Sequence, residues 1–302
     1  CNIEIHHNRE REWRGHIAEG GRVMRLKPRY NADVNQWWMC DAGRYGYKGI
    51  DQHRLTAAQV REDGALRPAV WDEALQRLGD ALARLQQAKQ LDQAGVILSS
   101  HLTNEDLYAA RQVFAALGIG QVVFQRPTPG DADAFLIQAD KSPNARGAAA
   151  LGLREGAEEL LAKAVSKQLR ILVVFTQDLV VLFGEDRVRQ AAQQLELLAF
   201  VGPNANATAA LAHVVLPSAV YAEKDGTFTN VQGRVQRFHA ALDPLGESKP
   251  EWAILTELAA RLRLPVAFAD APAIFAELAK TERPFAGMSS ATLGDAGLMV
   301  QT

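Results

Sequence analysis

The sequence predicts an α/β protein in which a small β-rich unit precedes two β-α-β units. Residues 2–7 alternate polar and apolar side chains, as a strand with one buried face does. After residue 70, short apolar runs alternate with stretches of helical periodicity, the pattern of a parallel sheet with crossover helices. The 302 residues, 48% of them hydrophobic, are enough for about two domains at ~150 residues each.

The β-rich unit is predicted from two short strands. Residues 23–28 form the second alternating run, and a charged insertion from Asn8 to Gly21 separates it from the first. Cys1 and Cys40 lie at the two ends of this unit. Pairing of the strands would bring the two ends, and with them the two thiols, close together.

The first β-α-β unit is predicted between Gly49 and Gly152. Its predicted elements are a connecting loop over residues 55–67, a helix from Trp71 to Leu85, a strand from Gly95 to Leu98, a helix capped by Thr103 and ended by Gly118, and a strand from Val122 to Phe124. Strand, helix and strand in this order imply a parallel pair with a right-handed crossover. Because no G-x-G-x-x-G follows the first strand, a standard dinucleotide site is not predicted.

A second set of alternating elements is predicted from Leu153 to Leu216. Its strands cover residues 171–175, 197–201 and 214–216, and its helices cover residues 158–165, 187–195 and 205–211. Two further amphipathic helices are predicted from Lys249 to Leu262 and from Pro272 to Lys280, followed by a weakly patterned tail.

The composition limits the possible functions. A formal net charge of −2 gives no reason to expect nucleic acid or an anionic membrane as partner. Two cysteines form no disulfide framework, which favours a reducing compartment. No apolar run reaches the ~20 residues of a membrane span. The seven histidines are scattered without metal-ligand spacing and are expected to be structural.

The segment from His213 to Phe238 carries the most informative motif. A short apolar strand ends at Pro217, a polar turn over residues 223–226 follows, and Gly233 interrupts the next run. An ordinary hairpin with a charged turn would explain the pattern as a purely structural one. Acidic, amide and basic side chains at this strand end are also typical of α/β sites. The residues of the motif are Glu223, Gly226, Thr227, Asn230, Gly233, Arg234 and Gln236.

This motif resembles the E-x-x-G-T-x-x-N-x-x-G-R-x-Q segment of the molybdopterin oxidoreductase superfamily. In the form A-E-K-D-G-T-F-T-N-x-x-G-R-V-Q it is most similar to the family of large iron-sulfur subunits of bacterial NADH:quinone oxidoreductase (complex I). The stretches S-S-x-L-T-N-E-D-L-Y, from residue 99, and D-A-F-L-I-Q-A-D-K-S-P-N, from residue 133, resemble further segments of the same families. Fold membership alone does not fix a function.

The resemblance implies a role for the two cysteines. The segment from Cys1 to Tyr45 resembles the iron-sulfur domain of the superfamily, in which Cys1 would be the third ligand of a 4Fe-4S cluster and Cys40 the fourth. Two further ligands would lie upstream of Cys1, so the ligand set in this chain is incomplete. A pair of small buried thiols is the alternative explanation.

The pterin chemistry of the superfamily is not expected here. Active members commonly have C-x-K-G at this point, with a lysine between cluster and pterin, whereas this chain has Cys40-Asp41-Ala42-Gly43. No cysteine follows Cys40, and residues 125–131 offer no thiol to molybdenum. The resemblance therefore implies a 4Fe-4S cluster and no bound molybdopterin, and no catalytic residue is assigned.

The fold expected from the resemblance has three parts. Residues 1–50 form a partial iron-sulfur domain of the molybdopterin type, residues 51–152 the first α/β unit, and residues 153–302 the second, with the motif loop at 217–238 and the C-terminal helices. The main hypothesis is an electron-transfer and structural subunit of complex I, a proton-translocating enzyme that passes electrons from NADH to quinone. Its partners would be other peripheral-arm subunits at the cytoplasmic side of the bacterial inner membrane, and the isolated fragment would be inactive.

Two alternatives remain open. The first is a fragment of a catalytic molybdopterin oxidoreductase, such as a formate dehydrogenase α subunit. The second is a secreted lipoprotein binding module that starts at a lipidated Cys1, and it arises because the chain begins with a cysteine and not with methionine. A secreted lipoprotein begins its mature chain with a lipidated cysteine, but it usually continues with a flexible tether, which the alternating residues 2–7 do not resemble.

Overall fold

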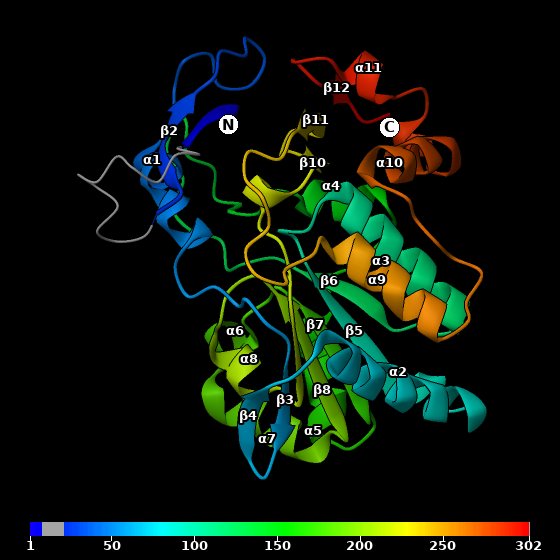
Figure 1. The fold of residues 1–302 in the computed structure, drawn as a ribbon. Helices are drawn as coiled ribbons and strands as arrows, with labels where there is room; N and C mark the ends of the chain where they lie inside the picture. The colour runs from blue at the N-terminus through cyan, green and yellow to red at the C-terminus, as the bar shows by residue number, and fades with distance from the viewer. Residues whose placement is uncertain (8–20, 302) are drawn as a thin grey trace.

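The computed structural model describes residues 1–7 and 21–301, and a seven-stranded sheet forms the centre of the protein (Figure 1). The strands of this sheet, in spatial order, are β4 (Ala65–Pro68), β3 (Gln59–Glu62), β9 (Val214–Pro217), β8 (Leu197–Gly202), β7 (Ile171–Phe175), β5 (Ala94–Ser99) and β6 (Val122–Gln125). The five strands from β9 to β6 are parallel, and the pair β3–β4 joins them antiparallel.

The register of the parallel strands matches their apolar sequences. Val96 in β5 pairs with Val122 in β6 on one side and with Val173 in β7 on the other. β5, β7 and β8 are buried over their whole lengths, because helices cover both faces of the sheet. The predicted α/β class and the predicted parallel strands are confirmed.

Helices pack on both faces of the sheet and around its ends. They are α1 (Asp41–Tyr45), α2 (Trp71–Gln87), α3 (Asn104–Leu117), α4 (Ala145–Ala150), α5 (Ala157–Val165), α6 (Leu179–Phe183), α7 (Glu185–Gln194), α8 (Ala207–Leu211), α9 (Glu251–Arg261), α10 (Ala271–Thr281) and α11 (Ser290–Leu293). Short 3-10 turns are η2 (Gly46–Ile50), η3 (Leu91–Gln93), η4 (Tyr221–Glu223) and η5 (Arg283–Phe285).

Alternate residues of the strands face two separate cores. One core contains the apolar faces of α2, α3, α9 and α10, and the other contains those of α5, α7 and α8. In β7, for example, Val173 belongs to the first core, and Leu172 and Val174 belong to the second. This is the two-residue period of a strand between two helical layers.

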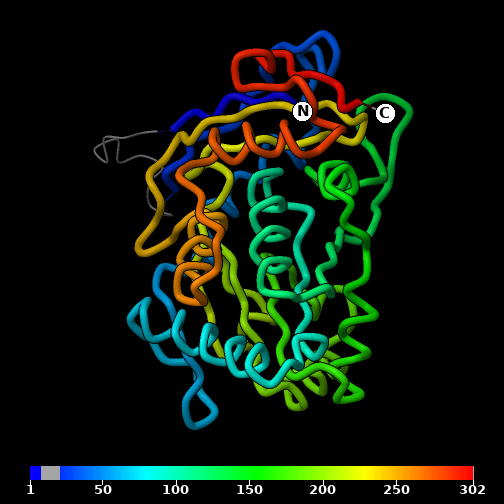
Figure 2. The backbone as a smooth tube through the Cα atoms, turned by 90° about the vertical axis from the view of Figure 1, so that its right-hand side faces the viewer, coloured from blue at the N-terminus to red at the C-terminus, as the bar shows by residue number. Residues whose placement is uncertain are grey.

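The N-terminal unit and the C-terminal segments meet at one end of the molecule (Figure 2). Both predicted strands of this unit are present, and β1 (Ile3–His7) pairs antiparallel with β2 (Val23–Pro28). β10 (Gly226–Thr229), β11 (Arg234–Phe238) and β12 (Leu298–Met299) form a third, antiparallel sheet. The predicted charged insertion from Asn8 onward lies almost entirely outside the described residues.

The predicted connecting loop over residues 55–67 is wrong, because the chain there forms the hairpin of β3 and β4. Its turn is Asp63-Gly64, with φ angles of 49° and 81°. Asp-Gly is a preferred sequence for two-residue hairpin turns, which require positive φ at both positions. The signal was present in the sequence, and β3 then pairs with the central sheet through Gln59 and Val60.

The boundaries of the three predicted parts stay a prediction. Strands from residues 51–152 and from residues 153–302 pair within the same central sheet. Among the helices that the structure describes, none has the length and apolar character needed to cross a bilayer.

Replacement of Gly147 by alanine is expected to destabilise the protein on the order of 3 kcal/mol, because the new Cβ would overpack the site. It would lie 2.1 Å from Asn104 Oδ1 and 2.2 Å from Asn144 Oδ1. Both oxygens are held by hydrogen bonds from Thr229 and cannot move away freely. Urea unfolding measures the effect, and Gly120→Ala, whose Cβ would meet nothing within 4 Å, is the control. Equal stability of the two variants would contradict this account of the packing.

Candidate functional site

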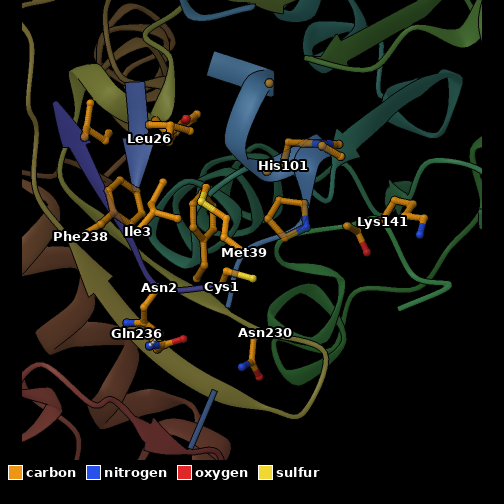
Figure 3. A pocket seen from close by; sticks show the side chains of 18 of the residues that line it. Cys1, Asn2, Ile3, Leu26, Met39, His101, Lys141, Asn230, Gln236 and Phe238 are labelled. Carbon is orange, nitrogen blue, oxygen red and sulfur yellow. Dashed lines mark hydrogen bonds between the residues drawn. The ribbon is translucent and has the colours of Figure 1, made fainter. Parts of the chain in front are cut away.

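A cavity of about 1530 Å³ lies between the N-terminal unit and the carboxyl ends of the parallel strands. Figure 3 shows side chains around it from the N-terminal unit (Cys1, Met39), a strand end (His101), the loop before α4 (Lys141) and the β10–β11 turn (Asn230). Residues that follow β5, β7, β8 and β9 all border this cavity. Ligands of open α/β sheets bind outside the carboxyl ends of the strands, so the cavity has the expected place for a site.

The chain reverses its direction of travel across the sheet between β5 and β7. β6 is added on one side of β5, and β7, β8 and β9 are then added on the other side. Such a switch point opens a crevice at the carboxyl ends of the two strands. Ser100 follows β5, and Thr176 and Gln177 follow β7 at this point.

Three buried oxygen atoms at the switch point have no hydrogen-bond partner within the described chain. They are Ser100 Oγ, Thr176 Oγ1 and Gln177 Oε1. Thr176 also has a φ of 60°, an unusual conformation for a β-branched residue. Buried polar atoms are nearly always hydrogen-bonded, and strained backbone concentrates at functional sites. The switch point is therefore suited to a polar ligand.

Cys1 and Cys40 both border the cavity as free thiols. Cys40 caps the N-terminus of α1, and its Sγ accepts a hydrogen bond from the Gly43 amide at 3.4 Å. Across residues 1–7 and 21–301, no three histidine, cysteine, aspartate or glutamate side chains are grouped as metal ligands. The structure thus brings the two predicted ligands to one cavity, and their role in a cluster stays a prediction.

His101 faces the cavity from the end of β5. Its ring is accessible from the cavity but is surrounded by protein, and this desolvation lowers the pKa of the imidazole. Ser99 Oγ lies 3.2 Å from His101 Nδ1. The imidazole is therefore neutral at neutral pH. The sequence predicted a structural role for this histidine, and no motif marked it as part of the site.

The expected polar turn at residues 223–226 is wrong at its first two positions, where the carboxylate and the ammonium group are buried. Arg54 binds Glu223 with two parallel hydrogen bonds, Nη1 to Oε1 at 2.8 Å and Nη2 to Oε2 at 2.7 Å. Arg22, next to β2, donates to the same carboxylate. Glu223 therefore ties the N-terminal unit to the segment that leaves the central sheet.

Lys224 is buried between two carboxylates. Its Nζ donates to Asp106 Oδ2 at 2.7 Å and also to Glu251 Oε2. Burial alone would lower the pKa of this ammonium, but the two carboxylates outweigh burial and raise it. Lys224 therefore stays charged. Lys224 and Glu251 also border the cavity.

The first turn of α3 is joined to β10 by buried hydrogen bonds. Glu105 accepts from the Thr227 amide at 2.8 Å and from the Thr227 hydroxyl at 2.9 Å. The side-chain amide of Asn104 donates to the hydroxyls of Thr227 and Thr229. Desolvation raises the pKa of Glu105 to about 7. This junction fixes one side of the cavity.

The rest of the motif shapes the β10–β11 turn. Asn230 Oδ1 accepts from the amides of Gln232 and Arg234, and Arg234 pairs with Asp33 at 3.0 Å. Gln236 donates to Asn2 Oδ1 at 2.7 Å and so connects β11 to the N-terminal unit. Asn230 and Gln236 also border the cavity, so the motif is both structural and part of the candidate site.

Comparisons with known proteins place this geometry in context. Residues 136–261 match the family model described as molybdopterin oxidoreductase. The chain is 39% identical over 143 residues to the F420-dependent formate dehydrogenase 2 subunit alpha of Methanococcus maripaludis, a match that covers 46% of this chain and 21% of the relative. It is 42% identical over 123 residues to the NADPH-Fe(3+) oxidoreductase subunit alpha of Geobacter sulfurreducens, which covers 40% of this chain and 14% of that protein.

A solved structure shares the fold. The acetylene hydratase from Pelobacter acetylenicus superposes with a TM-score of 0.63 at 10% sequence identity, over 100% of this chain and 73% of that chain. At this identity the likeness concerns the fold alone. The chain spans only about a fifth or less of the two curated relatives named above.

Glu223→Ala is expected to lower the free energy of unfolding by roughly 3–5 kcal/mol, because Arg54 would keep a buried charge without its partner. The side chain of Arg54 is 2% exposed and that of Glu223 is 0% exposed. Urea denaturation of both forms measures the loss. Glu158→Ala, which breaks the exposed pair with Arg187, is the control and should leave stability nearly unchanged. If both variants unfold at the same urea concentration, the Glu223 pair is not a main support of the fold.

Between about pH 4.5 and about pH 7, stability is expected to fall as the pH rises, by an amount on the order of 3 kcal/mol from Glu105 alone. The folded state holds the Glu105 proton up to a pKa of about 7, whereas the unfolded chain releases it near the ordinary value of 4.5. The folded state therefore binds more protons, and raising the pH favours unfolding.

Glu105→Gln mimics the protonated carboxyl and should remove this part of the pH dependence. Urea midpoints at several pH values, compared with those of the wild type and of Glu159→Gln on the exposed face of α5, measure the difference. A wild-type curve that runs parallel to that of Glu105→Gln would show that Glu105 is ionised throughout this range.

Proposed function

We propose that the chain is part of the large subunit of an iron-sulfur oxidoreductase of the molybdopterin oxidoreductase superfamily, because residues 136–261 match the model of that family and the relatives named above are α subunits of oxidoreductases. One observation carries the proposal. The two thiols and the carboxyl ends of four parallel strands border the same cavity. An electron-transfer group at the thiols and a large polar cofactor at the strand ends would therefore share one space.

The two thiols fit part of a cluster site. Cys1 and Cys40 would hold two irons of a 4Fe-4S cluster, which supplies one-electron transfer when bound. The described residues contribute no third ligand beside them, so the remaining ligands would come from elsewhere in the protein. The chain's own contribution is to fix Cys40 at the start of α1, next to Met39 and the cavity.

The switch point fits a polar cofactor. Ser100, Thr176 and Gln177 offer buried oxygen atoms that lack partners within the described chain. In this proposal Thr176, which borders the cavity, binds a polar group of a pterin guanine dinucleotide, the cofactor that stores and transfers two electrons in this superfamily. Ser100 and Gln177 lie at the same switch point. The surrounding strand ends would position it and exclude water.

The relatives support the catalytic alternative better than the complex I hypothesis. Those named above are α subunits of a formate dehydrogenase and of an NADPH-Fe(3+) oxidoreductase. A fragment of a formate dehydrogenase-type α subunit is therefore the preferred function. The substrate of this protein and its activity as a whole are part of the proposal.

The large iron-sulfur subunit of complex I remains the second candidate, because a specific feature favours it. Ala42 stands where catalytic members commonly carry a lysine between cluster and pterin, and no thiol follows Cys40 in the sequence. A subunit that had lost pterin chemistry would need neither group. Other peripheral-arm subunits as partners, and attachment to the cytoplasmic side of the inner membrane, belong to this candidate and stay predictions.

Cofactor analysis of the complete protein that contains this chain separates the candidates. After anaerobic purification we expect iron, together with stoichiometric molybdenum or tungsten and an extractable pterin guanine dinucleotide. Thr176→Val, which removes the hydroxyl that borders the cavity, should reduce the retained pterin, whereas Ser166→Ala, at the exposed end of α5, should not. Cys40→Ser should lower the iron content and the electron paramagnetic resonance signal of one cluster.

Each other outcome has a definite meaning. Iron without molybdenum, tungsten or pterin would reject the formate dehydrogenase-type function in favour of the complex I subunit. Cluster signals unchanged in Cys40→Ser would reject the role of Cys40 in either candidate.

A further inference from the structure

Two charged side chains of the cavity, Lys224 and Glu251, take no part in the cofactor sites proposed above. Both are almost fully buried, with exposed fractions of 5% and 2%. They come from different parts of the chain, since Lys224 follows η4 and Glu251 begins α9. Charged groups are rarely buried in this way unless the site uses them or pairs them closely.

The ionic network around Lys224 contains more negative than positive groups. Asp106 and Glu251 both contact the single ammonium group of Lys224. Glu105, the neighbour of Asp106 on α3, is a third buried carboxyl beside it, and its partner Thr227 is neutral. Glu223 precedes Lys224 and adds no net positive charge to the network. The charges of its two arginine partners are balanced by its own carboxylate and by the carboxylate of Asp51. When all its carboxyls are ionised, the network therefore carries excess negative charge.

The two carboxylates on Lys224 are not equally supported. Besides Lys224, Asp106 accepts from the Thr103 hydroxyl at 2.8 Å, the Thr103 amide at 3.3 Å and the Trp252 amide at 3.0 Å. Within the described chain, the side chain of Glu251 accepts, besides Lys224, only from the Ser218 hydroxyl, at 2.8 Å. Hydrogen bonds to a carboxylate favour its charged form, so Glu251, which has the fewer donors, is the carboxylate of this pair that is better suited to bind a proton.

We propose that Glu251 is a proton-binding site of the cavity, which takes up a proton when negative charge enters the cavity and releases it when that charge leaves. The step is Glu251 carboxylate plus one proton giving the carboxylic acid, with the proton drawn from water or from a group in the cavity. Lys224 keeps its own proton, because its pKa is raised by the carboxyl groups that its ammonium contacts. No other bond changes.

Two further facts agree with this assignment. Burial raises the pKa of Glu251, and the repulsion from Asp106 adds to this effect, so that together they outweigh the attraction of Lys224. Glu251 and Cys40 border the same cavity, so a charge placed at Cys40 acts on Glu251 across a shared space.

The inference deepens the proposed function and rests on it for its biological use. Oxidation of a substrate that loses a proton with its electrons needs a proton acceptor near the site, and arrival of an electron favours proton uptake nearby. The proton-binding property itself depends only on the network and the cavity. Its test below contains no cofactor measurement, so its failure and the failure of the proposed function are distinguishable.

The test uses infrared spectroscopy of the complete protein with carbon-13-labelled glutamate, over a range from about pH 5 to about pH 9. The band of a protonated carboxyl is assigned to Glu251 by its loss in Glu251→Gln. Ser218→Ala removes one hydrogen-bond donor to Glu251 and leaves the charges in place. It should raise the pH midpoint at which the Glu251 band is half lost, and this shift gives a second assignment of the band. Glu257→Gln on the exposed side of the same helix should leave the band unchanged.

Two Cys40 variants, which both lack the thiol, then differ from each other only in the charge at the cavity. Cys40→Asp adds a carboxylate, and Cys40→Asn adds a neutral group of similar shape. The Glu251 midpoint is expected to be higher in Cys40→Asp by roughly half a pH unit or more, as a unit charge within ~20 Å gives at an effective dielectric constant of ~20. A Glu251 that is ionised with an ordinary midpoint, or equal midpoints in the two variants, would overturn the proposal.

Discussion

The buried ion pairs of Lys224 with Asp106 and Glu251 are the constraint on which the arrangement of this protein depends. They join three elements far apart in the sequence, namely the first turn of α3, the segment after η4 and the first turn of α9. Each charge has left water, so removing one partner leaves another buried charge uncompensated, at a cost of several kcal/mol. The pairs therefore fix the position of the motif segment on the helices of the central sheet.

The neighbouring contacts extend this constraint to both ends of the cavity. Glu223 holds Arg54 and Arg22, and through Arg22 it holds the N-terminal unit. Glu105 holds Thr227 at the start of the β10–β11 hairpin. The cavity between these parts is thus bordered by segments locked to one another by buried polar contacts. A polar cofactor at the switch point would add the partner that Thr176 lacks within the described chain.

The same network links the fold to the proposed chemistry. An ionic network with balanced charges would be only structural. The network around Lys224 holds more carboxyls than ammonium groups and borders the space proposed for the cofactors. Burial makes each added charge unfavourable in free energy, so buried carboxylates bind protons and thereby limit the net charge of the network. The residues that hold the domain together are therefore also able to respond to charge in the cavity.

The sequence by itself determined the parallel strands and most of the helices. Runs such as Ile171–Phe175 are apolar throughout because both faces of the strand are covered, and Thr103 marks the start of α3 because its hydroxyl satisfies a free backbone amide. These signals are local and can be read from a few neighbouring residues. The hairpin at Asp63-Gly64 had such a signal as well, although its strands are short and half polar.

Only the tertiary structure decided the surroundings of the polar residues. The expected polar turn contains Glu223 and Lys224, which look solvated in the sequence because their ion-pair partners are not near them in the chain. Arg54 and Asp106, one partner of each, lie more than a hundred residues away, and Glu251, the second partner of Lys224, lies 27 residues away. The placement of Cys1 and Cys40 at one cavity, and the switch point at Ser100 and Thr176, likewise follow from strand order. Periodicity reports which face of an element is buried, whereas strand order and long-range ion pairs depend on the free energy of the whole folded chain.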